Sequence, residues 1–450
     1  MNISTTTGRR RLSLILALLL IGLACPALAA QQAPPDRTLR LESVSILPDD
    51  PGTVALVRRH LSLAAGAPVD VASLSLARQT LEEAGYFHEV DLYTARGTAP
   101  GMVVLHIEVE LDRRLHFLTG YGYQPLDGWY LNLLGARLLN RPRSGSELRL
   151  AWRQGFIIKG LYLEGSMPTA DRAGNAWRFE FHVATKSWFV YEGREAWRQD
   201  IEQSALRLGR QTPLGAGGLV TSWIGISHTD PADELAAFFD ESDQQRPADE
   251  LIPATFEEHD YLDLLIEGHW QNRDQVRPWW RGTWAGARLR ASHETGGLGF
   301  LTMELDGRHN WPVGDTASLA GRLRGAHATA NTPYHQRFQF GGVYSVRGYD
   351  FAYLSGPLGA SSLVQANLEY RVALLDRDAA LPRVTALVFL DTGQAWDHDG
   401  GSFGWVVGAG YGVRVRLPWV QSLGLDVGYP VTNLGDISPF VINLALGWSY

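Results

Sequence analysis

The residues that could carry enzyme chemistry are few, and their spacing supports no recognisable reaction centre. Cys25, the only cysteine, lies in an apolar N-terminal leader, so the mature chain has no thiol nucleophile. His88 and His106 have no cysteine or second histidine at metal-ligand spacing, and His182 belongs to no recognisable Ser-His arrangement. The sequence therefore predicts a protein that is not an enzyme, with no catalytic residue, cofactor or metal.

One short stretch nevertheless has unusual chemistry. Residues 338–350 read FQFGGVYSVRGYD and place Arg347 among glycines, between segments that alternate apolar and polar residues. A guanidinium can bind a carboxylate through two parallel hydrogen bonds, so a single arginine can fix both the position and the orientation of a loop. Glycines allow the tight backbone turns that such a loop needs. The surrounding elements must therefore supply the carboxylate.

From Leu115 onward the chain consists of segments of about ten residues that alternate in period two, which is typical of a transmembrane β-barrel. In residues 363–374, LVQANLEYRVAL, the polar side chains at odd positions oppose the apolar ones at even positions. His182 and Arg414 lie on the polar faces of two other segments. Because a charge at the bilayer midplane costs about 2–4 kcal/mol, these polar faces are predicted to line the lumen.

Sixteen such segments can be placed, an even number as a closed bacterial barrel requires, because closure satisfies every strand edge in lipid. They are 115–124, 129–140, 147–154, 156–165, 176–185, 203–211, 218–229, 259–272, 281–293, 300–313, 317–328, 361–374, 384–396, 404–417, 421–430 and 440–450. If the first strand rises from the periplasm, the loops after odd-numbered strands are external. These loops include the stretch around Arg347 and the acidic insert at 230–251, which is predicted to be a solvated loop.

The N-terminus has the pattern of a signal peptide over residues 1–29. Three arginines at 9–11 precede the apolar run LSLILALLLIGLA, and the ALA sequence at 27–29 fits a cleavage site. Lipid attachment at Cys25 and twin-arginine export are the alternatives. Removal of the leader lowers the formal net charge of -8 by a further three. This acidic balance gives no reason to expect nucleic acid binding.

Residues 37–112 have the pattern of a compact α+β unit in the order strand, helix, helix, strand, strand. The first strand, 39–46, is expected to bury Leu39 and Leu41, and the first helix is expected to end at Gly66. A second helix stops at Gly85, and two strands follow within residues 88–110.

Together these motifs resemble the BamA/TamA outer-membrane assembly and transport superfamily, which also contains the two-partner secretion transporters. The junction LEEAGYFHEVDLY resembles part of a POTRA domain, and FGGVYSVRGYD resembles the signature loop that the superfamily carries between its eleventh and twelfth strands. ANLEYRV, VFLDTGQAW, GAGYGVRVRLP and LGLDVGYP look like the later strands, in order. The resemblance implies a periplasmic POTRA domain at 37–112 and an all-β, 16-stranded transmembrane barrel at 113–450, with the loop 331–360 folded inward.

The resemblance also implies site residues. In the family the loop arginine meets an acidic residue of a Phe-x-Asp-x-Gly strand, and the matching positions are Arg347 and Asp391. The alternation of side chains along this strand also turns Asp391 toward the lumen, because an aspartate should not face lipid. Glu369, inward on the preceding strand, is a second candidate partner. The implied loop latch comprises Gly341, Gly342, Val346, Arg347, Gly348 and Tyr349, and the implied terminal recognition signal comprises Leu446, Trp448 and Tyr450.

The function implied by the resemblance is insertion or translocation of unfolded polypeptides at the outer membrane of a Gram-negative bacterium. The expected partners are polypeptide clients, outer-membrane lipids and, through the POTRA domain, periplasmic accessory proteins, with no nucleic acid. A passive channel or structural outer-membrane protein without a client chain, and an outer-membrane enzyme, are the alternatives. The single POTRA unit departs from the several units of assembly factors and the usual two of secretion transporters, so the client stays open.

Overall fold

The computed structural model describes residues 39–61, 63–124, 128–169, 174–238, 244–254, 256–276, 279–295, 297–375, 382–398, 401, 403–417, 422–435 and 437–446. The predicted leader with Cys25, and the terminal residues Trp448 and Tyr450, lie outside this described part of the chain. Neither of the two α-helices within it is long and apolar enough to span a bilayer.

The N-terminal part is an α+β unit built on one four-stranded sheet. Its elements are β1 (Leu39–Leu47), α2 (Pro51–His60), β2 (Pro68–Val69), α3 (Val71–Ala84), β3 (Phe87–Arg96) and β4 (Met102–Leu111). The strand order is β2-β1-β4-β3, with β1 parallel to β4 and the other pairs antiparallel. The order strand, helix, helix, strand, strand is the predicted one, with the two-residue β2 added between the helices.

Local sequence signals begin and end the two helices. Asp50 caps α2 by accepting hydrogen bonds from the backbone of Gly52 and Thr53 at 3.1 and 3.0 Å. A glycine with φ +71°, Gly85, ends α3 as predicted. The expectation that α2 continues to Gly66 is wrong. The helix ends at His60 because the chain becomes extended there and packs Leu61 and Leu63 against the core.

Alternation along the strands places the core of this unit between the sheet and the helices. Leu41 is fully buried, as are Leu105 and Ile107 on β4. Leu39 is 45% exposed, so its predicted core position is wrong, because it stands at the very start of the edge-proximal strand.

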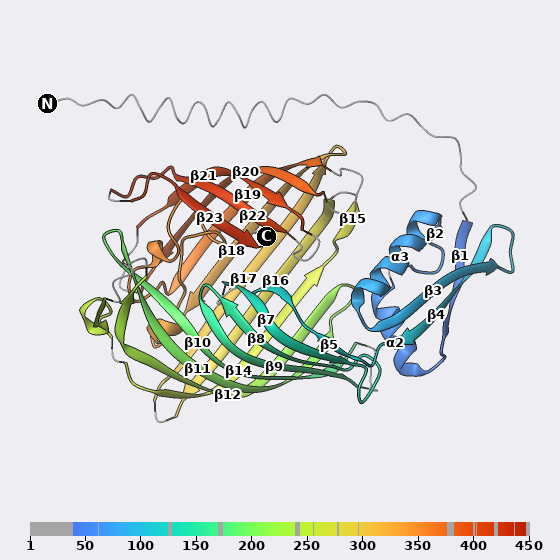
Figure 1. Cartoon of the computed structure of the whole chain (residues 1–450), viewed down its shortest axis with the longest axis horizontal. Helices are drawn as coiled ribbons and strands as arrows, with labels where there is room; N and C mark the ends of the chain where they lie inside the picture. The colour runs from blue at the N-terminus through green and yellow to red at the C-terminus, as the bar shows by residue number, and fades with distance from the viewer. Residues whose placement is uncertain are drawn as a thin grey trace.

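The remainder of the described chain forms a closed antiparallel barrel, which lies beside the α+β unit in Figure 1. Its strands are β5 (Leu115–Phe117), β6 (Gly120–Gln124), β7 (Gly128–Leu139), β8 (Glu147–Gly155), β9 (Ile158–Pro168), β10 (Ala176–Glu192), β11 (Glu195–Pro213), β12 (Gly218–Ala237), β13 (Gln245–Pro247), β14 (His259–Gln271), β15 (Asp274–Val276), β16 (Trp279–Glu294), β17 (Gly299–Val313), β18 (Ala317–Ala328), β19 (Ser362–Leu375), β20 (Val384–Trp396), β21 (Val406–Val415), β22 (Leu423–Pro430) and β23 (Val441–Leu446).

The barrel has the predicted sixteen strands among the described residues. β5 and β6 both pair with β7 and act as one interrupted strand, while the short β13 and β15 extend the ends of their neighbours β12 and β16. β12 pairs directly with β14, and β14 with β16. The strand order places the last strand, β23, next to the first, β5.

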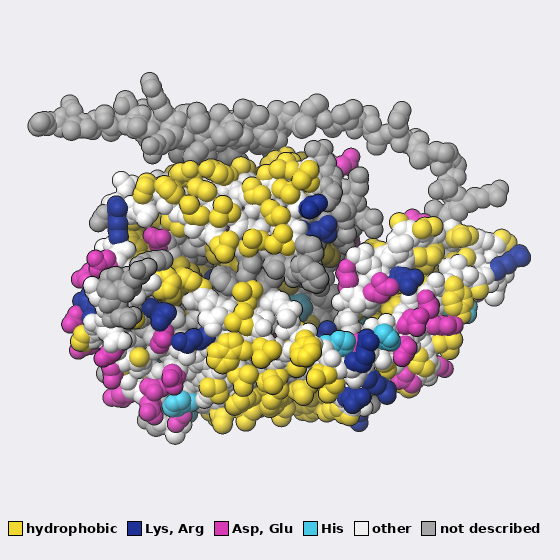
Figure 2. Space-filling model, in the orientation of Figure 1, with side chains coloured by type: hydrophobic (Ala, Val, Ile, Leu, Met, Phe, Trp, Pro, Cys, Tyr) yellow, Lys and Arg dark blue, Asp and Glu magenta, His cyan; other side chains and the backbone are white. Residues whose placement is uncertain are grey.

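Alternation sorts the barrel residues between lipid and lumen. On β19 the polar residues Gln365, Asn367, Glu369 and Arg371 are buried, whereas Leu368 between them is 37% exposed. In Figure 2 hydrophobic side chains form a broad band across the visible face of the barrel, and charged side chains gather at its two ends. This is the distribution that a hydrocarbon layer around the barrel requires.

The strands differ from the predicted ones mainly at the end of the barrel away from the α+β unit. β10, β11 and β12 run well beyond the predicted segments at 176–185, 203–211 and 218–229. The described part of the acidic insert belongs to this extension, so its prediction as a solvated loop is wrong there. The reason is apolar burial within an acidic segment. Fully buried Leu235, Ala248 and Ile252 pack with Trp188 and Trp197 from the neighbouring strands.

Candidate functional site

The connection between β18 and β19 folds into the lumen. It contains the short 3-10 helices η2 (Tyr334–Gln336) and η3 (Tyr353–Ser355), and an antiparallel bridge joins Phe338 to Ala360 near its two ends. Its arginine, Arg347, has no solvent exposure. A charge buried this completely is costly unless it is paired and hydrogen-bonded, so its partners define the site.

Arg347 binds both carboxylates that the sequence singles out. Its Nε and Nη2 donate to the two oxygens of Asp391 at 2.7 and 2.9 Å, which is the bidentate geometry of a guanidinium on a carboxylate. The backbone N–H of Arg347 donates to the same carboxylate at 3.1 Å. Its Nη1 donates to Glu369 Oε1 at 2.5 Å. Asp391 therefore fixes both the main chain and the side chain of the loop.

A third carboxylate, Asp426 on β22, also faces Arg347, with 3.4 Å between Nη1 and Oδ2. Two wall arginines complete the network. Arg371 approaches Glu369 at 2.6 Å, and Arg414 holds both oxygens of Asp426 at 2.6 and 2.8 Å. Three guanidiniums thus face three carboxylates, and their formal charges cancel. Such a balance is what makes the complete burial of these groups possible.

The sequence identified Arg371 and Arg414 as lumen-facing residues but not as members of this network, and it did not identify Asp426. A signal for Asp426 was available. It is the one charged residue of the strand segment LGLDVGYP, and parity alone would have turned it away from lipid. What parity could not give is the distance across the lumen between β22 and the loop.

An aromatic wall residue adds to the contacts of Arg347. The guanidinium carbon lies 3.6 Å from the ring centroid of Phe389, two residues before Asp391 on the same face of β20. A guanidinium placed over a buried aromatic ring gains a favourable electrostatic interaction with the ring face. The Phe-x-Asp pair therefore holds the arginine on two sides.

Glycines let the loop turn at this site. Gly341 and Gly348 have φ values of +117° and +101°, which side-chain-bearing residues rarely adopt. A Cβ on Gly348 would also lie 2.7 Å from the backbone of Tyr429 on β22. Gly342 has φ +90°. All three glycines of the predicted latch therefore occupy conformations or spaces that glycine alone fits well.

The barrel wall carries two complementary glycines that sequence reasoning missed. A Cβ on Gly408 of β21 would overlap the carbonyl oxygen of Arg347, and one on Gly428 of β22 would overlap the backbone nitrogen of Gly348. The loop backbone therefore lies directly against the backbone of the wall. The segments GAGYG and DVGYP contain the signal, since an isolated glycine in a strand marks close approach of another backbone.

The remaining predicted latch residues seal the loop around Arg347. The hydroxyl of Tyr349 donates toward the carbonyl oxygens of Thr432 and Val407 at 2.8 and 3.1 Å. Val346 is fully buried and packs in one apolar cluster with Phe340 and Leu363.

Other predicted residues lie elsewhere. Leu446 ends β23, far along the chain from the loop, and the rest of the terminal signal is outside the described residues. His182 faces the lumen with Nδ1 3.2 Å from Glu180. His88 and His106 lie on the α+β unit, where His106 stacks on Tyr93. Within the described ranges no cluster of three His, Cys, Asp or Glu side chains could hold a metal ion.

The α+β unit is fixed to one end of the barrel by polar contacts. Asn140, in the turn between β7 and β8, donates its amide hydrogens to the carbonyl oxygens of Tyr86 and Asp112, both at 2.7 Å. Tyr86 Oη lies 3.1 Å from Glu147 Oε2 at the start of β8. The end of the barrel that carries this turn therefore faces the α+β unit, as Figure 1 shows.

Fold and site together define an outer-membrane β-barrel whose lumen holds one of its own loops. Residues 173–449 match the Omp85 superfamily domain. Because this match covers more than half of the chain, the protein belongs to the Omp85 superfamily. The predicted membership of the BamA/TamA superfamily is thereby confirmed, and with it an outer-membrane location and a role of the protein transporter or insertase kind.

Solved structures share the fold at low sequence identity. BamA from Haemophilus ducreyi lacking POTRA domains 1–3 aligns with a TM-score of 0.59 and 15% identity, over 90% of this chain and 85% of that one. CdiB from Acinetobacter baumannii aligns with a TM-score of 0.52 and 15% identity, over 91% and 73% respectively. CdiB from Escherichia coli aligns with a TM-score of 0.51 and 12% identity, over 99% and 98%. No curated protein matches the chain by sequence.

Proposed function

We propose that this barrel inserts or translocates unfolded polypeptides at the bacterial outer membrane. The observation that carries the proposal is an Omp85-superfamily barrel whose inward loop is fixed to one wall by Arg347 and Asp391. The guanidinium and the backbone N–H of Arg347 both bind Asp391 on one wall. On the other side of the lumen, Trp188 and Tyr191 of β10 donate hydrogen bonds to carbonyl oxygens of the same loop, at 2.9 and 2.6 Å. In this proposal the arginine is a latch, and it carries out no chemical step.

The α+β unit acts as a single POTRA domain in the periplasm. Its element order and its attachment at the β7–β8 turn support this role. β3 is the last strand of its sheet, with exposed Glu89 and Asp91. An extended client or accessory protein can add a strand to such an edge through main-chain hydrogen bonds.

The junction between β23 and β5 is the place where a client strand would enter the barrel wall. β5 has three residues and is interrupted before β6, so the β5 side of this junction is short compared with the long strands β10, β11 and β12. Fewer backbone hydrogen bonds must then be broken to part this junction than any long ladder would require.

Crosslinking from this junction tests the function. A photoreactive amino acid at Phe117 or Leu444, which are 84% and 54% exposed, is expected to capture unfolded outer-membrane or secreted chains in living cells. Matched controls are Leu264 and Ile226 on β14 and β12, exposed by 54% and 60%. These lipid-facing positions should capture no client.

One combined result would contradict the proposed function. Equal capture at junction and control positions, together with an unchanged outer-membrane and secreted proteome after depletion of the protein, would leave a barrel without a client chain. Steady solute conductance in a planar bilayer would then support a passive channel.

A further inference from the structure

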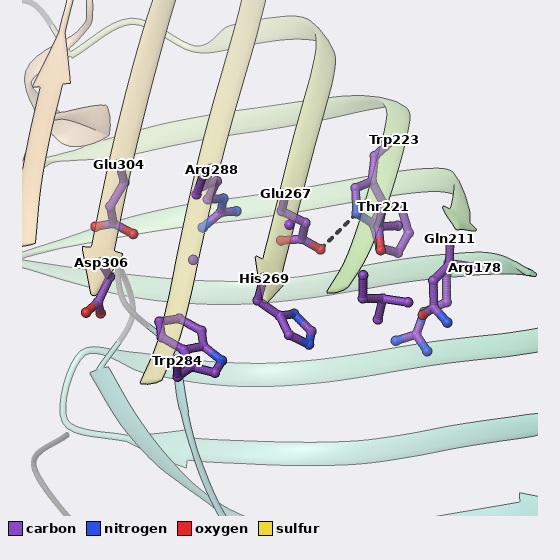
Figure 3. A pocket seen from close by; sticks show the side chains of 14 residues that line it. Arg178, Gln211, Thr221, Trp223, Glu267, His269, Trp284, Arg288, Glu304 and Asp306 are labelled. Atoms are coloured by element: carbon purple, nitrogen blue, oxygen red, sulfur yellow. Dashed lines mark hydrogen bonds between the residues drawn. The ribbon is translucent and has the colours of Figure 1, made fainter. Parts of the chain in front are cut away.

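A second site lies in the lumen on the wall formed by β10 to β17. It adjoins the inward loop, because Arg322 donates both to its Asp306 and to the carbonyl oxygen of Tyr344, at 2.7 and 3.0 Å. It is a pocket of about 300 Å³, and Figure 3 shows its side chains projecting from neighbouring strands. Its charged and aromatic lining includes Arg178, Trp223, Glu267, Trp284, Arg288 and Glu304. All come from strand positions that parity turns toward the lumen.

The pocket opens near the end of the barrel that carries the α+β unit. Arg178 lies close to the start of β10, and His269 lies close to the end of β14. In an antiparallel barrel these strand ends are at the same level as the β7–β8 turn, where Asn140 binds the α+β unit. A chain that enters the lumen from that end therefore meets this pocket early.

The carboxylates of the pocket already have donors. Glu267 accepts a hydrogen bond from Trp223 Nε1 at 2.9 Å. Glu304 is bound by Arg324, with 2.9 Å between Nε and Oε2. Asp306 is bound by Arg308 and Arg322, each at 2.7 Å.

The two arginines of the pocket, unlike its carboxylates, have no hydrogen-bond partner within the part of the chain that the structure describes. Among the described residues neither Arg178 nor Arg288 forms a hydrogen bond or ion pair, and Arg288 Nε is buried without a partner. Glu267 and Glu304 stand opposite Arg288 on the neighbouring strands β14 and β17, where each already has another donor. Glu180, two residues from Arg178, is held by Arg207 at 3.0 Å and approached by His182 at 3.2 Å. The unfilled hydrogen-bonding capacity of the pocket therefore consists of cationic donors, which suit an anion.

Glycines place two indole rings flat on the wall of the same pocket. A Cβ on Gly286 would lie 2.5 Å from the ring of Trp284, and one on Gly209 would lie 2.5 Å from the ring of Trp223. Each ring therefore covers backbone rather than projecting across the lumen. Trp223 is only 8% exposed, and the guanidinium carbon of Arg308 lies 4.6 Å from the ring centroid of Trp284, so the apolar contact available beside the two arginines is the remaining exposed part of Trp284. An extended peptide can place a carboxylate on the arginines and an apolar group on that ring, whereas a small inorganic anion would reach the arginines alone.

We propose that this pocket binds an acidic side chain of an extended polypeptide inside the barrel, with Arg178 and Arg288 as the carboxylate donors. The proposal rests on the proposed function, since a polypeptide-handling barrel admits such chains to its lumen. It adds that acidic segments are held on the wall opposite the latch.

The test uses the full-length protein in lipid nanodiscs and short, blocked peptides that carry a neutral dye. One peptide contains glutamate beside tyrosine, and its partner has glutamine in place of glutamate. Fluorescence anisotropy should give about tenfold tighter binding of the glutamate peptide, because a charge-assisted hydrogen bond replaces a neutral one. Equal affinity of the two peptides would overturn the proposal without any variant.

Variants locate the site. Arg178→Gln and Arg288→Gln should each remove most of the preference for the glutamate peptide. Arg210→Gln is the matched control, because Arg210 lies one residue from the level of Arg178 but outside the barrel, over the ring of Trp177. Loss of preference in the control, or its retention in both lumen variants, would overturn the assignment. Heat-modifiable migration in gels confirms that each variant is folded.

Two further arms separate the alternatives. Free acetate that competes as well as the unlabelled glutamate peptide would show a simple anion site and overturn binding of a peptide. If junction crosslinking captures clients in cells while both dye-labelled peptides bind alike, the pocket proposal fails and the proposed function stands. If the glutamate peptide binds but no client is captured, the proposed function fails and the pocket remains.

Discussion

The two walls of the lumen differ in how their charges are satisfied. On β19 to β22 three arginines and three carboxylates bind one another, and the loop covers them. On β10 to β17 the carboxylates have donors, but Arg178 and Arg288 have no hydrogen-bonded partner in the described part of the chain. A complete, buried charge network therefore fixes the loop on the first wall, whereas the second wall keeps guanidinium donors that have no hydrogen-bonded partner among the described residues.

The largest expected effect comes from removing the loop arginine, Arg347, from the charge network on β19 to β22. Arg347→Ala leaves Glu369 and Asp391 buried without their loop partner, and loss of one partner of a buried pair costs about 3–5 kcal/mol. The loop should detach, so conductance and protease access to the loop should rise and transport should fall, while the barrel still inserts. Single-channel recording and limited proteolysis measure these changes. Wild-type loop protection and activity in the variant would refute the latch.

The matched substitution on the other wall is Arg288→Gln. Arg288→Gln should change the free energy of unfolding by less than about 0.5 kcal/mol, because Glu267 and Glu304, which stand opposite Arg288, keep their hydrogen bonds from Trp223 and Arg324. Urea unfolding monitored by gel mobility compares it with Arg347→Gln. Equal destabilisation by the two substitutions would show that Arg288 has a structural partner and that the walls are alike.

A change without any charge tests the backbone contact. Gly408→Ala and Gly428→Ala place a methyl group into the loop backbone at Arg347 and Gly348, so each should displace the loop and raise its protease sensitivity. Overpacking of this kind costs about 1–3 kcal/mol. Gly307→Ala is the control, since its Cβ would have a neighbour no closer than 3.9 Å. A loop that stays protected in both wall variants would contradict the close approach.

Exchanging the charges of Arg347 and Asp391 measures how much of the loop attachment depends on this one pair. Arg347→Asp combined with Asp391→Arg should restore part of what either change loses, with a coupling of about 0.5–3 kcal/mol. Restoration should be incomplete because Glu369 and Asp426 also face position 347 and would repel an aspartate there. Strict additivity in the double-mutant cycle would assign the latch to Glu369 or Asp426 instead.

The smallest expected effect concerns the joint between the α+β unit and the barrel. Hydrogen bonds from Arg114, with a further contribution from His116, hold the pKa of Asp112 well below its ordinary value. A lowered folded-state pKa contributes stability above about pH 4, and this contribution is lost as the pH falls through the folded-state pKa. Spin-label distances across the joint should therefore broaden only in strong acid. In Asp112→Asn they should already be broad at neutral pH, and a wild-type distance distribution there would contradict this role.

Much of the fold follows from the sequence because a barrel strand that turned its charged side chains toward lipid would be strongly destabilised. Gln365 to Arg371 alternate correctly since any one-residue slip would turn charges toward lipid. β10, β11 and β12 are longer than predicted because they continue beyond the apolar band, where Leu235 and Ile252 are buried by protein rather than lipid. Local alternation carries no information about such contacts.

The candidate site is likewise predictable only in part from local sequence patterns. Arg347, Asp391 and Glu369 come from a motif and from parity, which are both local. Asp426, Gly408 and Gly428 join the site only through the position of β21 and β22 across the lumen from the loop, and no local pattern fixes that position. The free donors of the opposite pocket are a further case, because an unpaired arginine is recognised only when every neighbour is in place.

The contacts of Arg347 also set an order for assembly. Its carboxylate partners follow it in the chain by 22, 44 and 79 residues, on β19, β20 and β22. The backbone of the loop rests on glycines of β21 and β22, which are among the last strands to be synthesised. The loop can therefore lock only after nearly the whole barrel has formed, and a nascent barrel that lacks its C-terminal strands keeps an unfastened loop. Loop fastening thus marks the completion of folding, and a truncated chain carries an exposed, protease-sensitive sign that it is unfinished.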